Sequence, residues 1–301
     1  MSYPRDIVGY GAHPPHADWP GNAKIAVQFV INYEEGGENS ILHGDKGSEA
    51  FLSEMVGAQS HEGERAMAME SLYEYGSRAG FWRLHRLFKE FGMPVTVFGV
   101  ASAMERNPEA VAAMKNADWE IATHGYKWID YQKAPEATER EHIRKAIEIH
   151  TKLTGSRPLG WYQGRTSPNT ARLVAEEGGF AYDADSYADD LPYYDAKHAK
   201  PQLIVPYTLD NNDMKFVALN GFDVGKQFAG YLTDAFEALY AEGDVAPKMM
   251  SIGLHCRIVA KPGRILGLRK FLEHVASRER VWVARRIDIA RHWLSHHPYK
   301  A

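Results

Sequence analysis

The chain has 301 residues, of which 45% are hydrophobic, so it is long enough to bury a large core. Its formal net charge of −4 excludes a general electrostatic attraction to nucleic acid or to anionic membranes. Cys256 is the single cysteine, so the chain can form neither an intrachain disulfide nor a cysteine cluster for zinc. We therefore expect a small polar partner, with no nucleic acid and no membrane involved.

The N-terminal residues, MSYPRDIVGYGAHPPHADWP, contain no apolar segment of the kind found in secretory signals. No apolar run approaches the roughly 20 residues that a membrane-spanning helix needs. We expect a soluble, cytoplasmic protein in which residues 1–22 form an arm rather than a helix.

Strands are indicated by short apolar runs along the chain. Residues 25–31, IAVQFVI, read as a strand buried on both faces, because the run is apolar and rich in β-branched residues without alternation. Further strands are predicted at 95–100, 119–122, 158–162, 182–185, 248–254 and 281–284, with weaker candidates at 203–205 and 216–219.

Helices are indicated by apolar residues at three- and four-residue spacing, with stop signals after them. Five apolar residues recur in this way between Phe81 and Phe91, and Gly92 follows as a stop. Residues 138–141 (TERE) match a capping box at the start of another helix. Apolar residues from Ile143 to Leu153 continue the face of that helix, and further helices are predicted over 108–114, 168–177, 225–242, 264–277 and 286–295.

The alternation of strands and helices predicts an α/β fold, in which a parallel sheet is connected by helical crossovers. At this length a closed or nearly closed barrel is favoured over an open sheet. We expect residues 1–301 to form a single catalytic (β/α) barrel domain, with an N-terminal arm at 1–22 and a long loop at 36–69. Loops this long are usually functional, and the hypothesis here is a lid.

Polar residues follow the predicted strands, and in parallel barrels the carboxyl ends of the strands carry the functional site. Asn32, Glu34 and Glu35 follow the strand at 25–31, beside two glycines. The candidates after the later strands are His124, Trp128, Asp130, Gln163, Arg165, Asp183, Asp185 and His255.

Each candidate also has an ordinary structural interpretation. The two glutamates can form a solvated turn, and the two histidines can be satisfied core residues. The tryptophans Trp128 and Trp161 can be core residues, and the two aspartates can shape a turn. The prediction of a site therefore depends on their joint placement at one rim.

The order of these residues resembles the polysaccharide deacetylase (NodB-homology) superfamily, over roughly residues 20–290. The segments that carry the resemblance are NYEEG (32–36) for the aspartate pair, THGYKW (123–128) for the histidine motif, RPLGWY (157–162) for the arginine motif, YDAD (182–185) for the aspartate motif and GLH (253–255) for the last motif. The resemblance implies a distorted (β/α) barrel with about seven parallel strands.

The chain departs from the family at the metal ligands, which are the second Asp of the pair and two histidines. Glu35 replaces that Asp, and His124 keeps the first histidine position. The second histidine falls at Lys127 or Trp128, but a lysine is normally cationic and an indole offers only an N–H donor. Because a zinc hydrolase normally keeps three protein ligands, we expect no metal and no other cofactor.

These losses, together with ESLYEYGSR (70–78) and the FWRL helix after it, resemble the metal-independent allantoinases of the same superfamily. The resemblance implies hydrolysis of the cyclic amide of allantoin to allantoate in purine and ureide catabolism. It also implies a homo-oligomer, and we favour a tetramer.

Amide hydrolysis without metal needs a base for water, an acid for the leaving nitrogen and a donor for the oxyanion. Two neighbouring carboxylates in a poorly solvated site cannot both ionise cheaply, so the pKa of one is raised. By alignment with the family, Glu34 is the candidate general base and His255 the candidate acid or oxyanion donor. We expect Glu35 to hold His124 or a ring N–H.

The predicted substrate contacts follow from the planar hydantoin ring. Arg165 can clamp carbonyl oxygens, and Asn32 can read donor and acceptor edges. Trp128, Trp161 or Tyr162 can stack on the ring.

Three other functions remain open from the sequence. The first is a metal-dependent polysaccharide or peptidoglycan N-deacetylase, and the second is a hydrolase of another cyclic amide or imide. The third is a non-catalytic ligand-binding or scaffold protein.

Overall fold

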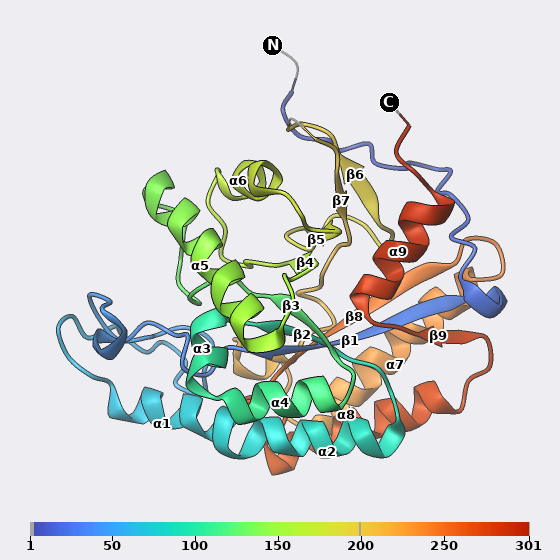
Figure 1. Ribbon diagram of the computed structural model, residues 1–301. Coiled ribbons are helices and arrows are strands. Elements are labelled where there is room, and N and C mark those ends of the chain that lie inside the picture. Colours follow the sequence, from blue (N-terminus) through green and yellow to red (C-terminus); the bar gives the residue numbers. More distant parts are fainter. Residues whose placement is uncertain (1–2, 199, 301) are drawn as a thin grey trace.

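A curled, mostly parallel sheet forms the centre of the computed structural model, which describes residues 3–198 and 200–300 (Figure 1). The strands follow the order β6-β7-β5-β4-β3-β2-β1-β8, and β9 pairs with β1. They are β1 (Ile25–Tyr33), β2 (Thr96–Gly99), β3 (Glu120–Thr123), β4 (Gly160–Trp161), β5 (Tyr182–Asp183), β6 (Tyr193–Asp195), β7 (Gln202–Ile204), β8 (Lys248–His255) and β9 (Val281–Val283).

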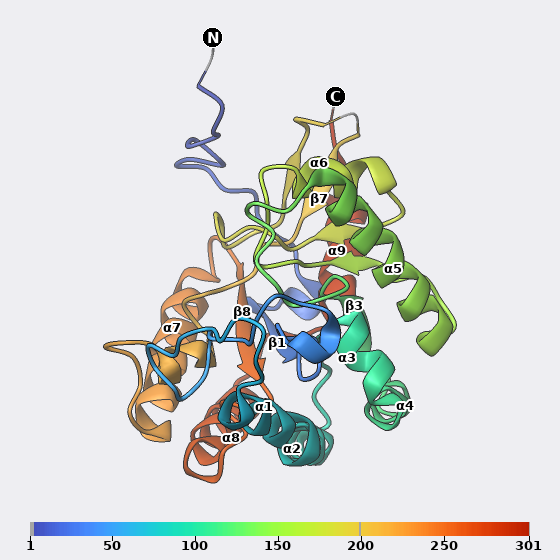
Figure 2. The same ribbon diagram turned by 90° about the vertical axis from the view of Figure 1, so that its left-hand side faces the viewer.

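Helices connect the strands, and α1, α2, α4 and α8 lie along one side of the sheet (Figures 1 and 2). The helices are α1 (Met67–Tyr75), α2 (Phe81–Phe91), α3 (Ala101–Arg106), α4 (Pro108–Asn116), α5 (Glu136–Thr154), α6 (Thr170–Glu177), α7 (Gly225–Glu242), α8 (Pro262–Ala276) and α9 (Arg286–His296). Short turns of other helix types are η1 (Pro20–Asn22), η2 (Ile41–His43), η3 (Gly76–Gly80) and η4 (Asp213–Val217).

The predicted α/β class and distorted barrel are confirmed, and most predicted elements lie where the sequence placed them. Two differences concern the same part of the chain. The strand predicted at 216–219 is wrong, because residues 213–217 form the 3-10 turn η4. The short strand β6 was not predicted, and it pairs antiparallel with β7, whereas the other pairings are parallel.

Strand β1 pairs with three other strands, β2, β8 and β9, and is buried along its whole length. β8 pairs with it from Ile25 to Asn32, in a register that places Asn32 opposite His255. On its other edge, β2 pairs with the carboxyl-terminal half of β1 and β9 with the amino-terminal half. The residues that follow β1 therefore enter the rim between the ends of β2 and β8.

An extended segment, residues 205–213, closes the gap between β7 and β8. Its first residue, Val205, donates its backbone N–H to Asp183 beside β7, and Asn212 forms an isolated parallel bridge with Gly253 of β8. We call residues 205–213 the seam segment. Because it ends at Asp213, it delivers that carboxylate to the carboxyl end of β8.

A buried arginine fixes the seam segment from inside the barrel. Arg286, which is fully buried, donates hydrogen bonds to the side chains of Gln28 and Ser251 and to the carbonyls of Val205 and Pro206. The interior of the barrel is therefore polar at this level and tied to the segment that closes it.

The long loop predicted at 36–69 folds into short pieces of structure. It contains η2 and an antiparallel bridge between Gly47 and Glu62, and α1 begins at Met67. Trp128 donates its backbone N–H to Gly37, and Lys127 donates to the carbonyl of His43 at 2.9 Å. The loop is thus held against the segment that follows β3.

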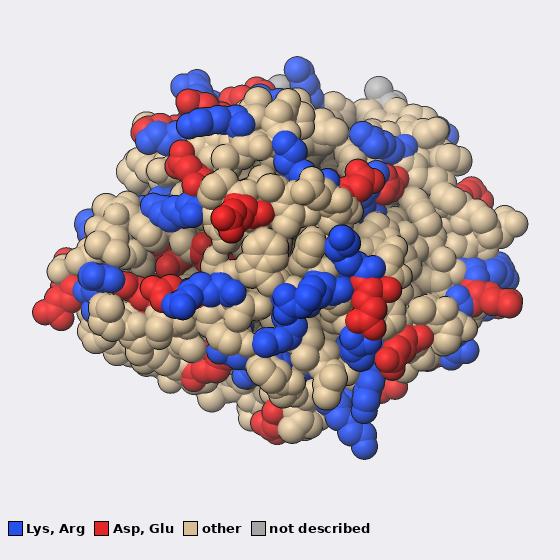
Figure 3. Space-filling model, turned by 60° about the horizontal axis from the view of Figure 1, so that its bottom comes forward, with Lys and Arg blue, Asp and Glu red and all other residues tan. Residues whose placement is uncertain are grey.

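Within the described residues, no helix is both long and apolar enough to cross a membrane. Figure 3 shows basic and acidic side chains interspersed over one face of the molecule. This distribution agrees with the small net charge.

The π-helical turn η3 lies between α1 and α2 in the chain. Two of its glycines make contacts that are too close for any other residue. A Cβ added at Gly76 would lie 2.3 Å from Oε1 of Glu35, and one added at Gly80 would lie 1.9 Å from the carbonyl oxygen of Cys256. The turn therefore brings helical backbone directly against the carboxyl ends of β1 and β8.

We expect Gly80→Ala to destabilise the protein by about 1–3 kcal/mol, because the new methyl group has to push helix and strand apart. Urea denaturation measures this free energy of unfolding. Gly230→Ala is the matched control, because this exposed position in α7 has no atom within 4 Å of a new Cβ. That change is expected to stabilise by about 0.5–1 kcal/mol through helix propensity. Equal effects of the two substitutions would contradict the close contact at Gly80.

Candidate active site

Two histidines and an arginine surround the carboxylate of Glu34 at the rim of the barrel. Oε1 of Glu34 lies 3.4 Å from Nε2 of His124 and 3.5 Å from Nε2 of His255. Nη1 of Arg257 lies 2.7 Å from its other oxygen, Oε2. All four side chains are nearly or fully buried. The structure thus brings together residues that follow β1, β3 and β8.

His255 is oriented by the carboxylate at the end of the seam segment. Oδ1 of Asp213 lies 2.6 Å from Nδ1 of His255, and Oδ2 accepts the backbone N–H groups of His255 and Val259. This pairing turns Nε2 of His255 toward Glu34. Aspartate, histidine and glutamate therefore form one chain of contacts at the rim.

The charges in this chain are set by burial and by partners. Burial opposes ionisation of Glu34, but Arg257 and His255 hold its pKa well below the ordinary value. Burial likewise opposes the charged form of His255, but Glu34 and Asp213 raise its pKa to about 9. At neutral pH the pair is therefore a carboxylate facing an imidazolium.

Glu35 has a different environment from its neighbour. Its side chain turns toward Gly76 and Arg257, whose Nη1 lies 3.5 Å from Oε1, and its Oε2 accepts the backbone N–H of Glu34. The predicted contact with His124 is therefore replaced by one with Arg257. Burial, followed by the charge of Glu34, raises the pKa of Glu35 to about 7, in spite of Arg257. The expectation that one of the paired carboxylates has a raised pKa is met by Glu35.

Trp128 and Arg165 lie together beside the central cluster. The indole of Trp128 stacks on Phe51 with ring centroids 5.8 Å apart, and the Arg165 guanidinium lies 5.1 Å from the indole centroid. The guanidinium of Arg257 lies 5.2 Å from the same indole centroid, so both cations lie against one aromatic ring. Both predicted substrate-binding residues are thus next to the catalytic candidates.

Tyr162 and Asn32 line the barrel interior below the histidines. Tyr162 stacks on Phe98 with centroids 4.6 Å apart and lies 4.8 Å from the ring of His124. Asn32 donates to the hydroxyl of Tyr207 and to the carbonyl of Leu254, so its amide group is engaged within the protein.

Trp161 is not brought to this cluster. It is fully buried in a separate group of apolar side chains with Leu173 and Val174 of α6, and its Nε1 donates to Asp185. Asp185 also accepts the backbone N–H groups of Gln163 and Gly164. Trp161 is therefore a core residue, and Asp185 shapes a turn.

Several buried polar atoms at the rim have no hydrogen-bond partner in the described part of the chain. Four are nitrogens, namely Nδ1 of His124, Nε2 of Gln163, Nη1 of Arg165 and Nη2 of Arg257, and a fifth atom is Oε2 of Glu34, which lies 2.7 Å from Nη1 of Arg257. Buried polar groups are rarely left unsatisfied in native proteins. Three of the four nitrogens are obligatory N–H donors, so the arrangement suits a ligand rich in carbonyl oxygens.

The side chains at the rim do not fit the divalent metal of the deacetylase family. Among residues 3–198 and 200–300, no group of three or more His, Cys, Asp or Glu side chains is arranged to hold a metal ion. Arg257 already supplies a permanent positive charge against both glutamates. Lys127, at one of the positions aligned with the second histidine, is paired with Asp45 instead.

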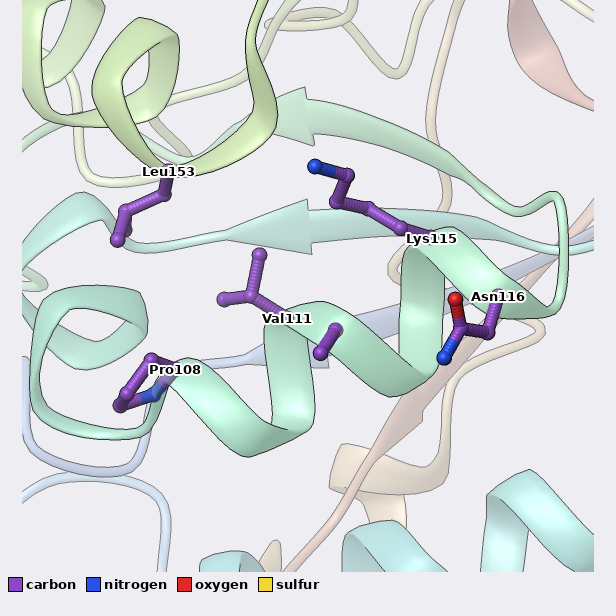
Figure 4. Close-up of a pocket in the computed structure, with 6 residues that line it drawn as sticks. Pro108, Val111, Lys115, Asn116 and Leu153 are labelled. Atoms are coloured by element: carbon purple, nitrogen blue, oxygen red, sulfur yellow. The ribbon is translucent and has the colours of Figure 1, made fainter.

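A surface hollow of about 190 Å³ lies between α4 and α5 on the outside of the barrel (Figure 4). It is lined by Pro108, Val111, Ala112, Lys115, Asn116 and Leu153. Its lining contains no carboxylate and no imidazole. This hollow therefore lacks the acid and base side chains that gather at the barrel rim.

The comparisons with known proteins agree with this fold. Residues 64–182 match the polysaccharide deacetylase family model. The chain is 45% identical to a putative polysaccharide deacetylase of Schizosaccharomyces pombe, over 99% of each chain. The chain belongs to the polysaccharide deacetylase family.

Two crystal structures are similar over nearly their whole length, each at 61% sequence identity and with a TM-score of 0.98. One is a probable polysaccharide deacetylase from Pseudomonas aeruginosa PAO1, and the match covers 99% of this chain and 100% of that one. The other is Puue allantoinase, and the match covers all of both chains. Chains this similar in sequence and backbone differ in the activity that their names give.

Two central residues, Arg257 and Asp213, were missed from the sequence. Arg257 follows His255 by two residues and was available as a charged residue just after a buried strand. Asp213 carried no comparable signal, because the segment before it was not recognised as the piece that closes the barrel.

We expect Glu35→Gln to change the pH dependence of stability. The pKa of Glu35 is raised from its ordinary 4.5 to about 7 in the folded protein, so the neutral carboxyl group favours folding. This stabilisation is present below about pH 4.5 and is lost as the pH rises through about 7. The glutamine variant is neutral throughout, so its advantage over the parent should grow between pH 5 and pH 8.

Urea denaturation at the two pH values measures that advantage. Glu148→Gln, on an exposed face of α5, is the control and should give the same difference at both. A constant difference for Glu35→Gln would contradict the raised pKa.

Proposed function

We propose that this protein is an allantoinase, which hydrolyses the cyclic amide of allantoin to allantoate without a metal ion. The observation that carries the proposal is the buried Glu34–His255 pair, whose two members face each other at 3.5 Å. The pKa of Glu34 is lowered and that of His255 is raised, so at neutral pH one can accept a proton and the other can donate one. These are the two protonation states that amide hydrolysis requires.

The donors at the rim support a ureide substrate. Allantoin presents ring carbonyls and a ureido tail, which accept hydrogen bonds. The unpartnered atoms of Gln163, Arg165 and Arg257 are side-chain nitrogens that donate hydrogen bonds. Trp128 adds a flat apolar surface that is almost completely buried. The 61% identity with a structure of an allantoinase points the same way.

In the proposed reaction, Glu34 takes a proton from a water molecule as the water oxygen bonds to the ring carbonyl carbon. The carbon–nitrogen bond then breaks, and His255 protonates the departing nitrogen. Asp213 contacts Nδ1 of His255, so the imidazole ring of His255 stays oriented after it has given up its proton. Glu34 and His255 are in contact, so the proton can return from one to the other.

Access to this rim requires movement of the loop at 36–69. The candidate catalytic residues are buried, and the carbonyl of Leu52 accepts a hydrogen bond from Nε of Arg257. Phe51 in the same loop covers Trp128. The lid hypothesis therefore stays part of the proposal.

The second candidate function is N-deacetylation of a polysaccharide, because the relatives from S. pombe and P. aeruginosa bear that name. Both reactions add water to an amide carbonyl. They differ in substrate and in the need for a cation.

We expect chelator-treated protein to open the ring of allantoin, followed as the appearance of allantoate. The same sample should release no acetate from an N-acetylated oligosaccharide when zinc is added. Glu34→Gln should lower kcat on allantoin at least about 100-fold through loss of the general base, whereas the exposed Glu105→Gln should not. If the protein instead releases acetate only when zinc is present and leaves allantoin intact, N-deacetylation becomes the favoured function.

The pH dependence of kcat should identify His255 as the acid. With a pKa of about 9 for its imidazolium, activity should persist at neutral pH and fall as the pH rises through about 9. Asp213→Asn removes one cause of the raised pKa, so the fall should begin at a lower pH. Asp210→Asn, at an exposed residue of the same segment, should leave the profile unchanged. An unshifted alkaline limb in Asp213→Asn would exclude this role for the pair.

A further inference from the structure

A single buried arginine gathers the contacts of the rim. Arg257 is fully buried, and its guanidinium lies 2.7 Å from Glu34 and 3.5 Å from Glu35. Its planar group also lies 4.2 Å from the ring centroid of Tyr73 and 5.2 Å from that of Trp128. Two carboxylates and two aromatic faces thus hold one cation in place, as an arginine without solvent requires.

The nitrogens of this guanidinium have different tasks. Nε donates to the carbonyl of Leu52, and Nη1 faces the two glutamates. Nη2 is buried and has no partner in the described part of the chain. A buried donor left without an acceptor destabilises the folded protein, so this nitrogen is suited to a ligand oxygen.

The position of Nη2 relates it to the chemistry. It shares the guanidinium carbon with Nη1, which lies 2.7 Å from Oε2 of Glu34, so an oxygen bound to Nη2 is held by the same planar group that contacts Glu34. A water molecule activated by Glu34 would therefore attack a carbonyl whose oxygen rests on the same guanidinium. A fixed donor at that oxygen stabilises the charge that develops as water adds.

We propose that Arg257 is a catalytic residue, whose Nη2 binds the carbonyl oxygen of the scissile amide and stabilises the oxyanion. The inference rests on the proposed function, since it assumes amide hydrolysis at this rim. As the water oxygen bonds to carbon, one water proton passes to Glu34 and the carbonyl π electrons move onto the oxygen held by Arg257. When the carbonyl re-forms, the carbon–nitrogen bond breaks and its electron pair takes the proton of His255. The sum is one water added to one amide.

This role gives Arg257 the task that a Lewis-acidic cation would have, without an exchangeable ion. The alternative is a purely structural arginine that anchors Leu52 and neutralises Glu34. The two differ in what a free guanidinium ion restores in a folded variant: a catalytic role predicts recovery of kcat with little change in KM, whereas a structural role predicts recovery of the free energy of unfolding.

The experiment measures kcat and KM for allantoin in the unmodified protein, Arg257→Ala and Arg257→Lys, with and without added guanidinium chloride at constant ionic strength. Loss of at least about 100-fold in kcat is expected for both variants, with a smaller change in KM. Guanidinium should restore Arg257→Ala in a saturable way, and urea or methylammonium should restore it less. Guanidinium should not activate the unmodified protein.

Arg264→Ala is the matched control, because Arg264 is a partly buried arginine of α8 paired with Glu54. It should keep kcat within about threefold and should not respond to guanidinium. Should Arg257→Ala fail to fold, Arg257→Lys decides, because it keeps the charge but lacks the second donor nitrogen of the planar guanidinium.

The NMR signals of hydrogen-bonded guanidinium N–H groups test the inference in the unmodified protein, without any substitution. Added hydantoin should shift the signal of a slowly exchanging guanidinium N–H group. Folded variants with near-normal kcat, a total loss that guanidinium does not relieve, or no shift with hydantoin would overturn the inference. Absence of allantoin turnover in the unmodified protein would instead overturn the proposed function.

Discussion

The structure of the rim depends on the ion pair between Glu34 and Arg257. A carboxylate in the interior of a protein is tolerated only when a charge of opposite sign and hydrogen-bond donors replace its water. Glu34 receives this from one guanidinium and two imidazoles, all within 3.5 Å. The strand ends that supply these groups have to meet within that distance. The arrangement of the strands in the barrel wall and the neutralisation of the buried carboxylate therefore depend on each other.

The same framework in the deacetylase family is expected to hold a metal ion, as the resemblance implies. In this chain the residues at those positions have taken other roles. Lys127 binds the loop at 36–69, and Trp128 lies against two guanidinium groups. A guanidinium is planar, permanently charged and covalently attached, whereas a bound ion has an exchangeable ligand sphere. Under the function proposed above, the Arg257 guanidinium takes the place that the resemblance gives to the metal ion.

The central part of the site could be predicted from the sequence because it follows long strands. The apolar run before Asn32 and the one before His255 each have one interpretation, so the residues after them fall at the rim. The position of Trp161 could not be predicted, because its strand has only two residues and an alternating pattern cannot be read from it. The pattern predicted that one of the two carboxylates has a raised pKa, but it did not predict that this carboxylate is Glu35. The orientation of the Glu35 side chain toward η3 could not be predicted either, because it depends on Gly76 in a distant helical turn.

The seam segment has a consequence for how activity relates to folding. Closure of the barrel and the charge on His255 both depend on residues 205–213, since Asp213 ends that segment and contacts the imidazole. A molecule in which this last piece has detached would keep most of its wall and helices, yet its histidine would lose the aspartate that orients and charges it. Molecules in which this segment is detached would thus be inactive. A measured turnover rate would report only the fraction of molecules in which the segment is in place.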